Sequence, residues 1–192
     1  MQKMTIGVIG RSSRPGESLP APVLDTAYQV GRGIAEAGAV LVGGGTGGVM
    51  EASCKGAAEN GGLTVGFLPY ADKSKANPYV NIVFPTGMGT IRNILTARSC
   101  DSIIMIGGGV GTLNEVTIAY DSGVPVVVLE GTTGWADRLK SSLDEGCWLD
   151  ERRVVAISFS STPEEAVATA VKRANEPRLG TRLEAFTGAA GQ

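Results

Sequence analysis

The 192-residue chain contains no histidine. Its absence excludes Ser-His-Asp and Cys-His nucleophilic catalysis, histidine-based zinc sites of the HExxH type and any acid–base step on an imidazole. If the chain performs chemistry, that chemistry must use carboxylates, Arg, Lys, Tyr or Ser/Thr. If a metal ion takes part, we expect a hard ion bound through oxygen.

Three other features are scarce: cysteines, long apolar runs and an excess of basic charge. The three cysteines, Cys54, Cys100 and Cys147, lie far apart, so a disulfide framework or a Cys-x-x-Cys zinc site is not expected. No apolar run approaches the ~20 residues of a membrane span, and the N-terminal segment lacks a signal-peptide pattern. The net charge of −2 disfavours binding to nucleic acid or to a membrane surface. We therefore expect a cytoplasmic protein that binds neither.

Glycine is abundant, with 28 residues, and short apolar runs alternate with helical patterns. Continuous apolar strands separated by helices are typical of a mainly parallel sheet that is covered on both faces. The pattern predicts an α/β fold: a single doubly wound, Rossmann-like domain over residues 1–175, with a loose C-terminal tail over 176–192. About seven strands are expected, at 4–10, 39–42, 63–68, 80–85, 102–106, 124–129 and 154–158, with helices ending near 38 and at 48–60, 88–99, 111–122, 134–145 and 163–174.

The loops that follow the expected strands are rich in small residues, hydroxyls and arginines. They cover residues 10–18, 43–51, 86–93, 107–115 and 131–138. In an open parallel sheet these loops meet at one edge, where ligands bind near a switch point in the strand order. The clustering predicts a ligand site at the carboxyl edge of the sheet.

Two of these loops, GGGTGGVME (43–51) and GGGVGTLNE (107–115), share one pattern. Each has three glycines, a variable residue, a glycine, three variable residues and a glutamate. Glycine lets backbone N–H groups approach a ligand, and a helix N-terminus attracts an anion. The pattern favours a phosphate in one or both loops, although neither is a Walker A motif. Tight turns without a ligand are the alternative, and dinucleotide binding through 43–48 lacks the acidic residue expected after the next strand.

Glu115 and Arg92 are the two charged residues of these loops that are candidates for a functional role. Thr112 and Glu115 also fit a Thr-x-x-Glu capping box, which would explain the glutamate without any chemistry. Arg92 stands near the start of a helix, where a cation opposes the helix dipole and calls for a bound anion or a nearby carboxylate. Arg11 and Arg14 in the first loop could attract an anionic ligand or simply face solvent.

The run MGTIRNILTARSCDSIIMIGGGVGTLNE (88–115) resembles the signature of the LOG (Lonely Guy) proteins, long labelled lysine decarboxylases. That signature is an Arg-bearing helix, an apolar strand and then P-G-G-x-G-T-x-x-E. GGGTGGVMEA (43–52) is similar to the family's first glycine motif. ANPYV (76–80), GTTGWADRL (131–139) and WLDERRV (148–154) resemble the branch that contains the molybdenum cofactor carrier proteins.

The resemblance implies a Rossmann-like homodimer or homotetramer that binds a phosphorylated small molecule. In LOG enzymes it implies hydrolysis of the N-glycosidic bond of cytokinin nucleoside 5′-monophosphates, which releases the free base and ribose 5-phosphate. The family's catalytic Arg and Glu fall on Arg92 and Glu115, and no decarboxylase lysine is readable. The candidate ligand- and phosphate-binding residues are Gly10, Ser12, Ser13, Gly44, Gly45, Thr46, Gly47, Met88, Arg92, Gly108, Gly109, Val110, Gly111 and Thr112.

Three residues depart from the LOG pattern. Gly107 replaces the usual proline, Asn93 replaces a lysine, and Val116 stands where a second Glu is common. The base-side pocket could therefore accept a pterin, so the leading hypothesis is a phospho-ligand carrier with the molybdenum cofactor as cargo. A nucleoside-monophosphate glycosidase is the second hypothesis, and a protein that acts only through its oligomer surfaces is the third. No cofactor or metal ligand is required, and a role for Mg²⁺ is left open.

Overall fold

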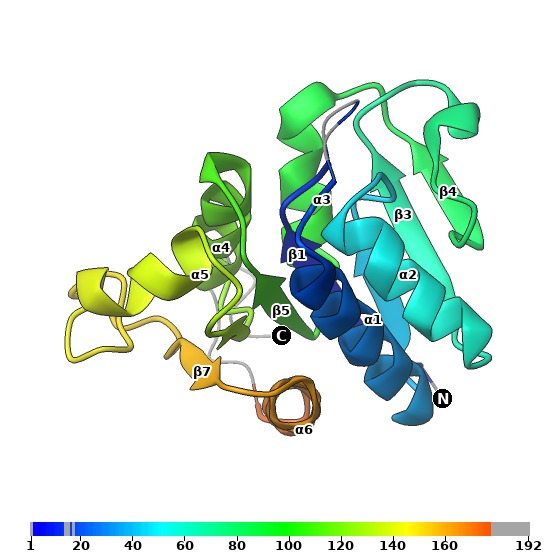
Figure 1. Cartoon of the computed structure of the whole chain (residues 1–192). Helices are drawn as coiled ribbons and strands as arrows, with labels where there is room; N and C mark the ends of the chain where they lie inside the picture. The colour runs from blue at the N-terminus through cyan, green and yellow to red at the C-terminus, as the bar shows by residue number, and fades with distance from the viewer. Residues whose placement is uncertain (1, 14–15, 17, 178–192) are drawn as a thin grey trace.

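Seven strands form one parallel sheet in the order β4-β3-β2-β1-β5-β6-β7 (Figure 1). The computed structural model describes residues 2–13, 16 and 18–177. The expected α/β class and the parallel sheet are confirmed. The strands span Thr5–Gly10 (β1), Val40–Gly43 (β2), Thr64–Leu68 (β3), Ile82–Pro85 (β4), Ser102–Ile106 (β5), Val126–Leu129 (β6) and Ser158–Ser160 (β7).

Helices cover the sheet on two sides, which confirms the doubly wound arrangement. One group, α1, α2 and α6, packs together on one face, and α3, α4 and α5 lie on the other. The helices are Ala21–Glu36 (α1), Val49–Glu59 (α2), Asn93–Arg98 (α3), Val110–Asp121 (α4), Trp135–Arg138 (α5) and Pro163–Ala174 (α6). Short 3-10 turns add Lys73–Lys75 (η1), Gly89–Arg92 (η2) and Leu139–Ser142 (η3).

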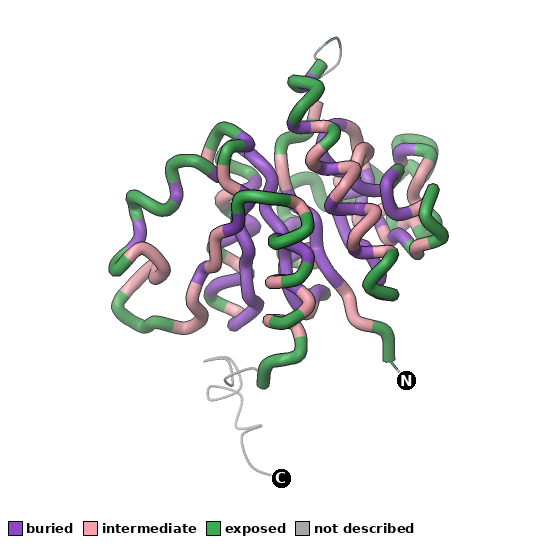
Figure 2. The backbone as a smooth tube through the Cα atoms, turned by 60° about the horizontal axis from the view of Figure 1, so that its bottom comes forward, coloured by how far each residue is buried: buried purple, intermediate pink, exposed green. Residues whose placement is uncertain are grey.

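The central strands hold the core together because their side chains alternate between the two faces. In β5, Ile104 and Ile106 join the cluster under α1, α2 and α6, whereas Ile103 and Met105 join the cluster under α3, α4 and α5. Every residue of β5 and β6 is buried. In Figure 2 the buried backbone, purple, runs through the middle of the molecule. A strand buried on both faces must be apolar throughout, so these runs lack the alternation of a half-exposed strand.

Three expected elements differ from the structure. The helix expected at 88–99 is η2 followed by the shorter α3. The apolar run 154–158 was expected to be the seventh strand, but pairing with β6 starts only at Ser158. Val154 and Val155 pack beside the core, and the Ile157 N–H donates to the carbonyl of Cys147 instead of to β6. The expected helix 134–145 is the short α5 followed by η3, because Leu143 adopts an extended backbone. In the expected tail, residues 178–192 lie outside the described residues.

The strand order places a switch point between β1 and β5. The chain leaves β1 toward β2 on one side, and β5 lies on the other side. The loops that follow these two strands therefore diverge and leave a crevice at the carboxyl edge, where ligands of open α/β sheets bind.

Candidate functional site

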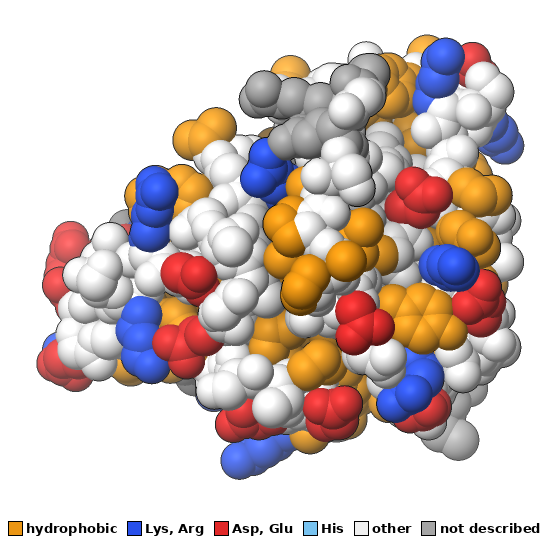
Figure 3. Space-filling view, in the orientation of Figure 1, with side chains coloured by type: hydrophobic (Ala, Val, Ile, Leu, Met, Phe, Trp, Pro, Cys, Tyr) orange, Lys and Arg blue, Asp and Glu red, His pale blue; other side chains and the backbone are white. Residues whose placement is uncertain are grey.

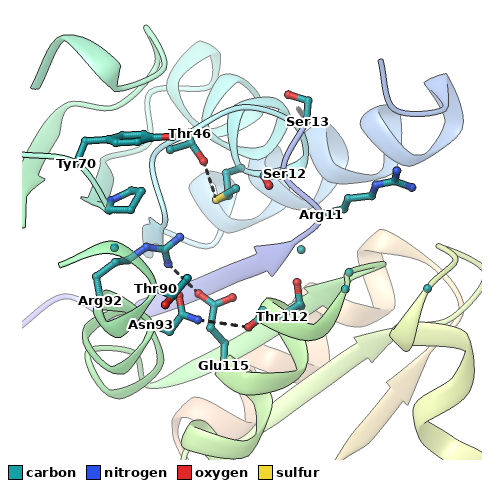
Figure 4. Close-up of a pocket in the computed structure, with 18 of the residues that line it drawn as sticks. Arg11, Ser12, Ser13, Thr46, Tyr70, Thr90, Arg92, Asn93, Thr112 and Glu115 are labelled. Carbon is teal, nitrogen blue, oxygen red and sulfur yellow. Dashed lines mark hydrogen bonds and ion pairs between the residues drawn. The ribbon is translucent and has the colours of Figure 1, made fainter. Parts of the chain in front are cut away.

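A cavity of about 780 Å³ lies at this switch point (Figure 4). Its walls come from the loops after β1, β2, β3, β5 and β6, together with η2 and the start of α4. In Figure 4, Tyr70 and Arg92 stand on one side of the cavity and Arg11, Ser12 and Ser13 on the other. Candidate residues from the sequence that line it are Gly10, Ser12, Ser13, Thr46, Arg92, Gly108, Gly109, Gly111, Thr112 and Glu115.

The second glycine loop brings the N-terminus of α4 to the cavity. Gly107 has φ 62° and its N–H donates to Thr132 Oγ1 at 2.8 Å. Proline could satisfy neither condition, since its ring fixes φ near −65° and removes the N–H. Gly109 is the N-cap of α4, with no side-chain cap, so the N–H groups of the first turn have no partner within the helix. They supply hydrogen-bond donors at the cavity wall.

The carboxylate of Glu115 faces the guanidinium of Arg92. The distance from Arg92 Nη1 to Glu115 Oε1 is 2.9 Å, and both side chains are about nine-tenths buried. The capping-box interpretation is wrong, because α4 begins at Val110 and Glu115 therefore lies in its second turn. Glu115 lines the cavity beside its partner. From its position near a helix start, Arg92 was expected to have a bound anion or a nearby carboxylate as a partner. Glu115 provides that carboxylate.

Burial raises the pKa of the Glu115 carboxyl to about 7, although the charge and hydrogen bond of Arg92 act to lower it. A carboxyl group with this pKa can exchange a proton near neutral pH, which is the range in which a general acid or base works best. Perturbed carboxyls of this kind gather at functional sites, although structural ion pairs also produce them.

Helix α3 turns its polar side toward the cavity and toward α4. Arg92 Nη1 also donates to Thr96 Oγ1 at 3.1 Å, and Asn93 Nδ2 donates to Asn114 Oδ1 at 3.0 Å. Asn93 and Thr96 are both buried. These hydrogen bonds connect η2 and α3 to α4 and hold the guanidinium at a fixed distance from the carboxylate.

The first glycine loop mainly supports the site, because apart from Thr46 its candidate residues do not line the cavity. A Cβ on Gly44 would lie 2.5 Å from Arg92 Nη2, so this glycine leaves room for the guanidinium. A Cβ on Gly47 would lie 2.6 Å from Ser13 Oγ. Gly45 lies against Gly66 of β3. The loop thus sets the positions of Arg92 and of the loop after β1.

Two other candidate residues from the sequence also do not line the cavity. Met88 and Val110 are exposed, Val110 to 79%. The sequence analysis missed several lining residues: Met50, Pro69, Tyr70, Gly89, Thr90, Asn93, Thr133 and Gly134. Tyr70 lies two residues after β3 and Thr133 four residues after β6, so the carboxyl-edge rule alone could have found them. Arg11 lines the cavity, whereas Arg14 lies outside the described residues.

The surface shown in Figure 3 carries acidic and basic side chains mixed together, without a large block of one sign. Among the residues that the structure describes, no helix has the length and hydropathy that a membrane span needs. Within the same residues, no group of three or more Cys, Asp or Glu side chains is placed to hold a metal ion.

The sequence and fold match known proteins. The sequence model of the SLOG cluster4 family matches residues 3–167. The crystal structure of TM1055 is 36% identical, covers 88% of this chain and 99% of its own, and superposes with a TM-score of 0.83.

Two further similar structures are of proteins that are named for the molybdenum cofactor. The molybdenum cofactor binding protein of Rippkaea orientalis is 32% identical, with 90% of this chain and 97% of its own covered and a TM-score of 0.75. The molybdenum cofactor carrier protein of Chlamydomonas reinhardtii is 31% identical, with 91% and 100% covered and a TM-score of 0.73. The resemblance to the LOG-like superfamily and to its cofactor-carrier branch is confirmed.

Proposed function

Because this chain belongs to the SLOG cluster4 family, we propose that it is a ligand-binding protein whose cavity holds a phosphorylated small molecule. The observation that carries the proposal is the open wall at the N-terminus of α4. A Cβ added to Gly109 or Gly111 would meet no atom within 4 Å, so these glycines fill no gap in the protein. They leave space beside unpaired backbone N–H groups, which is the environment that a phosphate needs.

The molybdenum cofactor is the leading candidate for this ligand. Its pyranopterin carries a terminal phosphate, and two structures similar to this one are named for binding or carrying that cofactor. In the proposed complex, the phosphate lies at Gly108–Thr112 and the pterin extends toward Tyr70 and Thr46 on the far side of the cavity. The cofactor is cargo here, so no reaction is required of Arg92 or Glu115.

A second function, hydrolysis of a nucleoside 5′-monophosphate, is supported by Glu115. Its carboxylate lines the same cavity as the proposed phosphate wall, and its pKa is about 7. With the phosphate at α4, Glu115 would act on the anomeric carbon as general base for water or by stabilising an oxocarbenium-like state. Arg92 would keep the carboxylate in place or bind the leaving group.

A single incubation separates the two functions. The pure protein is mixed with AMP and other nucleoside 5′-monophosphates, and free base is measured by chromatography. Release that is lost in Glu115→Gln, while that variant still binds nucleotide, indicates the glycosidase. Arg92→Ala should lose both turnover and affinity.

Absence of base release supports the carrier instead, provided that the protein binds the molybdenum cofactor saturably. Failure to bind any phosphorylated ligand would contradict both functions, because ligand present at 100 times its Kd would add about 2.7 kcal/mol to the free energy of unfolding. The requirement for Mg²⁺ is tested by adding EDTA to the same incubation. The oligomeric state, expected to be a homodimer or homotetramer, is a separate prediction.

A further inference from the structure

Among the described residues, three that are not glycine have a positive φ, and interactions within the protein account for two of them. Glu145 (φ 51°) and Arg153 (φ 49°) form an ion pair with each other, and the guanidinium of Arg153 lies 5.8 Å from the ring centre of Trp148. Thr133 has φ 72°, which is more strained because its side chain is β-branched. Strain of this kind persists only where the surrounding structure enforces it, and it is concentrated at functional sites.

The loop between β6 and α5 enforces the backbone conformation of Thr133. The carboxylate of Asp137 accepts hydrogen bonds from the N–H of Gly131 at 2.7 Å and from the N–H of Thr133 at 3.0 Å. Gly131 (φ 78°) and Gly134 (φ 65°) also have positive φ values. Glycine would suit position 133 better on backbone grounds, because it adopts a positive φ without a steric penalty. The threonine side chain therefore calls for an explanation of its own.

Packing within the protein does not explain this side chain. Thr133 is exposed and belongs to neither core cluster, and its hydroxyl has no hydrogen-bond partner among the described residues. The preceding residue, Thr132, is the opposite case. It is buried, and its hydroxyl donates to the carbonyl of Leu129 at 2.6 Å and accepts from the N–H of Gly107 at 2.8 Å. Thr132 thus holds the loop together, whereas Thr133 lines the cavity.

The same loop packs against the start of α4. The N–H of Trp135 donates to the carbonyl of Gly108 at 3.0 Å, and a Cβ on Gly134 would lie 2.3 Å from that carbonyl oxygen. Thr133 therefore lies beside the glycines at which the proposed function places a phosphate. Resting on that function, we propose that the hydroxyl of Thr133 donates a hydrogen bond to the phosphate, and that the enforced backbone presents the hydroxyl to it. Thr133 adds a side-chain donor to the backbone donors of the helix N-terminus.

Calorimetric titration of variants with AMP and with adenosine tests the hydrogen bond. Thr133→Val keeps the branched shape and removes the hydroxyl. Its affinity for AMP is expected to fall at least about tenfold, because a hydrogen bond to a charged group is lost, while its affinity for adenosine stays that of the wild type. Thr133→Ser keeps the hydroxyl and should bind AMP within about twofold of the wild type. Glu145→Gly is the matched control: it changes a positive-φ residue outside the cavity and should bind both compounds as the wild type does.

Thr133→Gly tests the backbone strain. The variant should melt about 3 °C above the wild type, because glycine adopts a φ of 72° without the steric cost. It should nevertheless bind AMP at least about tenfold more weakly, because it lacks the hydroxyl. A threonine kept for stability would show the opposite pattern, with a lower melting temperature in the variant and an unchanged affinity for AMP.

Two results overturn the role of Thr133. In the first, Thr133→Val retains the full wild-type preference for AMP over adenosine, a result that leaves the proposed phosphate site intact. In the second, Thr133→Gly melts below the wild type. A wild type without any preference for AMP over adenosine contradicts the proposed function itself, and the role of Thr133 with it.

Discussion

The two glycine loops share one sequence pattern but do different work in the structure. In the first, at 43–51, added side-chain atoms would collide with the protein: a Cβ on Gly48 would lie 2.6 Å from the carbonyl oxygen of Arg11. In the second, at 107–115, Gly109 and Gly111 face open space in the cavity. In the first loop glycine lets backbones pack closely, whereas in the second Gly109 and Gly111 leave open space beside the start of α4.

The two glutamates that end these loops differ in the same way. Glu115 is buried against Arg92 in the cavity, whereas Glu51 is partly exposed and lies outside that cavity. A shared pattern thus gives the local turn and helix start, and the neighbouring strands decide the role. Here β1 and β5 diverge around the second loop, while the first loop is held against the segment that follows β1.

We expect the greatest loss of stability from a substitution that disrupts the packing of the first glycine loop. Gly48→Ala combines a φ of 75° with a Cβ 2.6 Å from backbone atoms, so we expect the free energy of unfolding to fall by about 4 kcal/mol in urea denaturation. Gly61→Ala is the matched control, because Gly61 has φ 74° but open space around it. It should lose only about 1 kcal/mol. Equal losses in the two variants would show that the first loop is not closely packed.

The second largest loss of stability is expected when the buried ion pair between Arg92 and Glu115 is broken. Arg92→Leu leaves the Glu115 carboxyl buried without its donor and should lower the free energy of unfolding by about 3 kcal/mol. The double variant Arg92→Leu/Glu115→Leu removes both polar groups and should recover most of that loss. Additive losses in this double-mutant cycle would show that the two residues are not coupled in solution.

A pH titration tests the environment of Glu115. Because its folded-state pKa, about 7, is above the ordinary value of 4.5, this group stabilises the fold fully below pH 4.5, and the stabilisation is lost as the pH rises through 7. Relative to Glu115→Gln, the wild type should lose roughly 1 kcal/mol of unfolding free energy for each pH unit in that window. Parallel stability curves for the two proteins would indicate an ordinary, solvated carboxylate.

The smallest effect on stability is expected in the second loop. Gly109→Val adds bulk in open space at a β-type backbone, so the unfolding free energy should change by less than about 0.5 kcal/mol while affinity for AMP falls at least tenfold in calorimetry. Val110→Leu adds bulk to the same loop outside the cavity and should bind as the wild type does. If the wild type, Gly109→Val and Val110→Leu bound AMP equally well, the phosphate would not bind at this loop.

Most of the fold could be predicted because buried strands and amphipathic helices leave a clear pattern. All seven strands were expected, and six of them close to their observed bounds. The seventh was displaced because an apolar run such as Val154–Ile157 is equally suited to packing beside a core, and only the tertiary contact with Cys147 decides between the two.

The site was harder to predict at the level of single residues. The edge of the sheet follows from strand polarity, and Arg92 and Glu115 do meet there. Whether Glu115 caps its own helix depends on where α4 begins, because the capping box needs Thr112 as the N-cap and the observed N-cap is Gly109, three residues earlier. The role of the first loop depends on contacts with Arg92 and Ser13, which are distant in the sequence from Gly44 and Gly47.

A pair of calorimetric titrations checks the claim that the N-terminus of α4 binds a phosphate. AMP and adenosine differ only in the phosphate. We expect AMP to bind at least tenfold more tightly than adenosine, and we expect Gly109→Val to abolish the difference. Equal affinity for the two compounds, or a difference that persists in Gly109→Val, would contradict the claim.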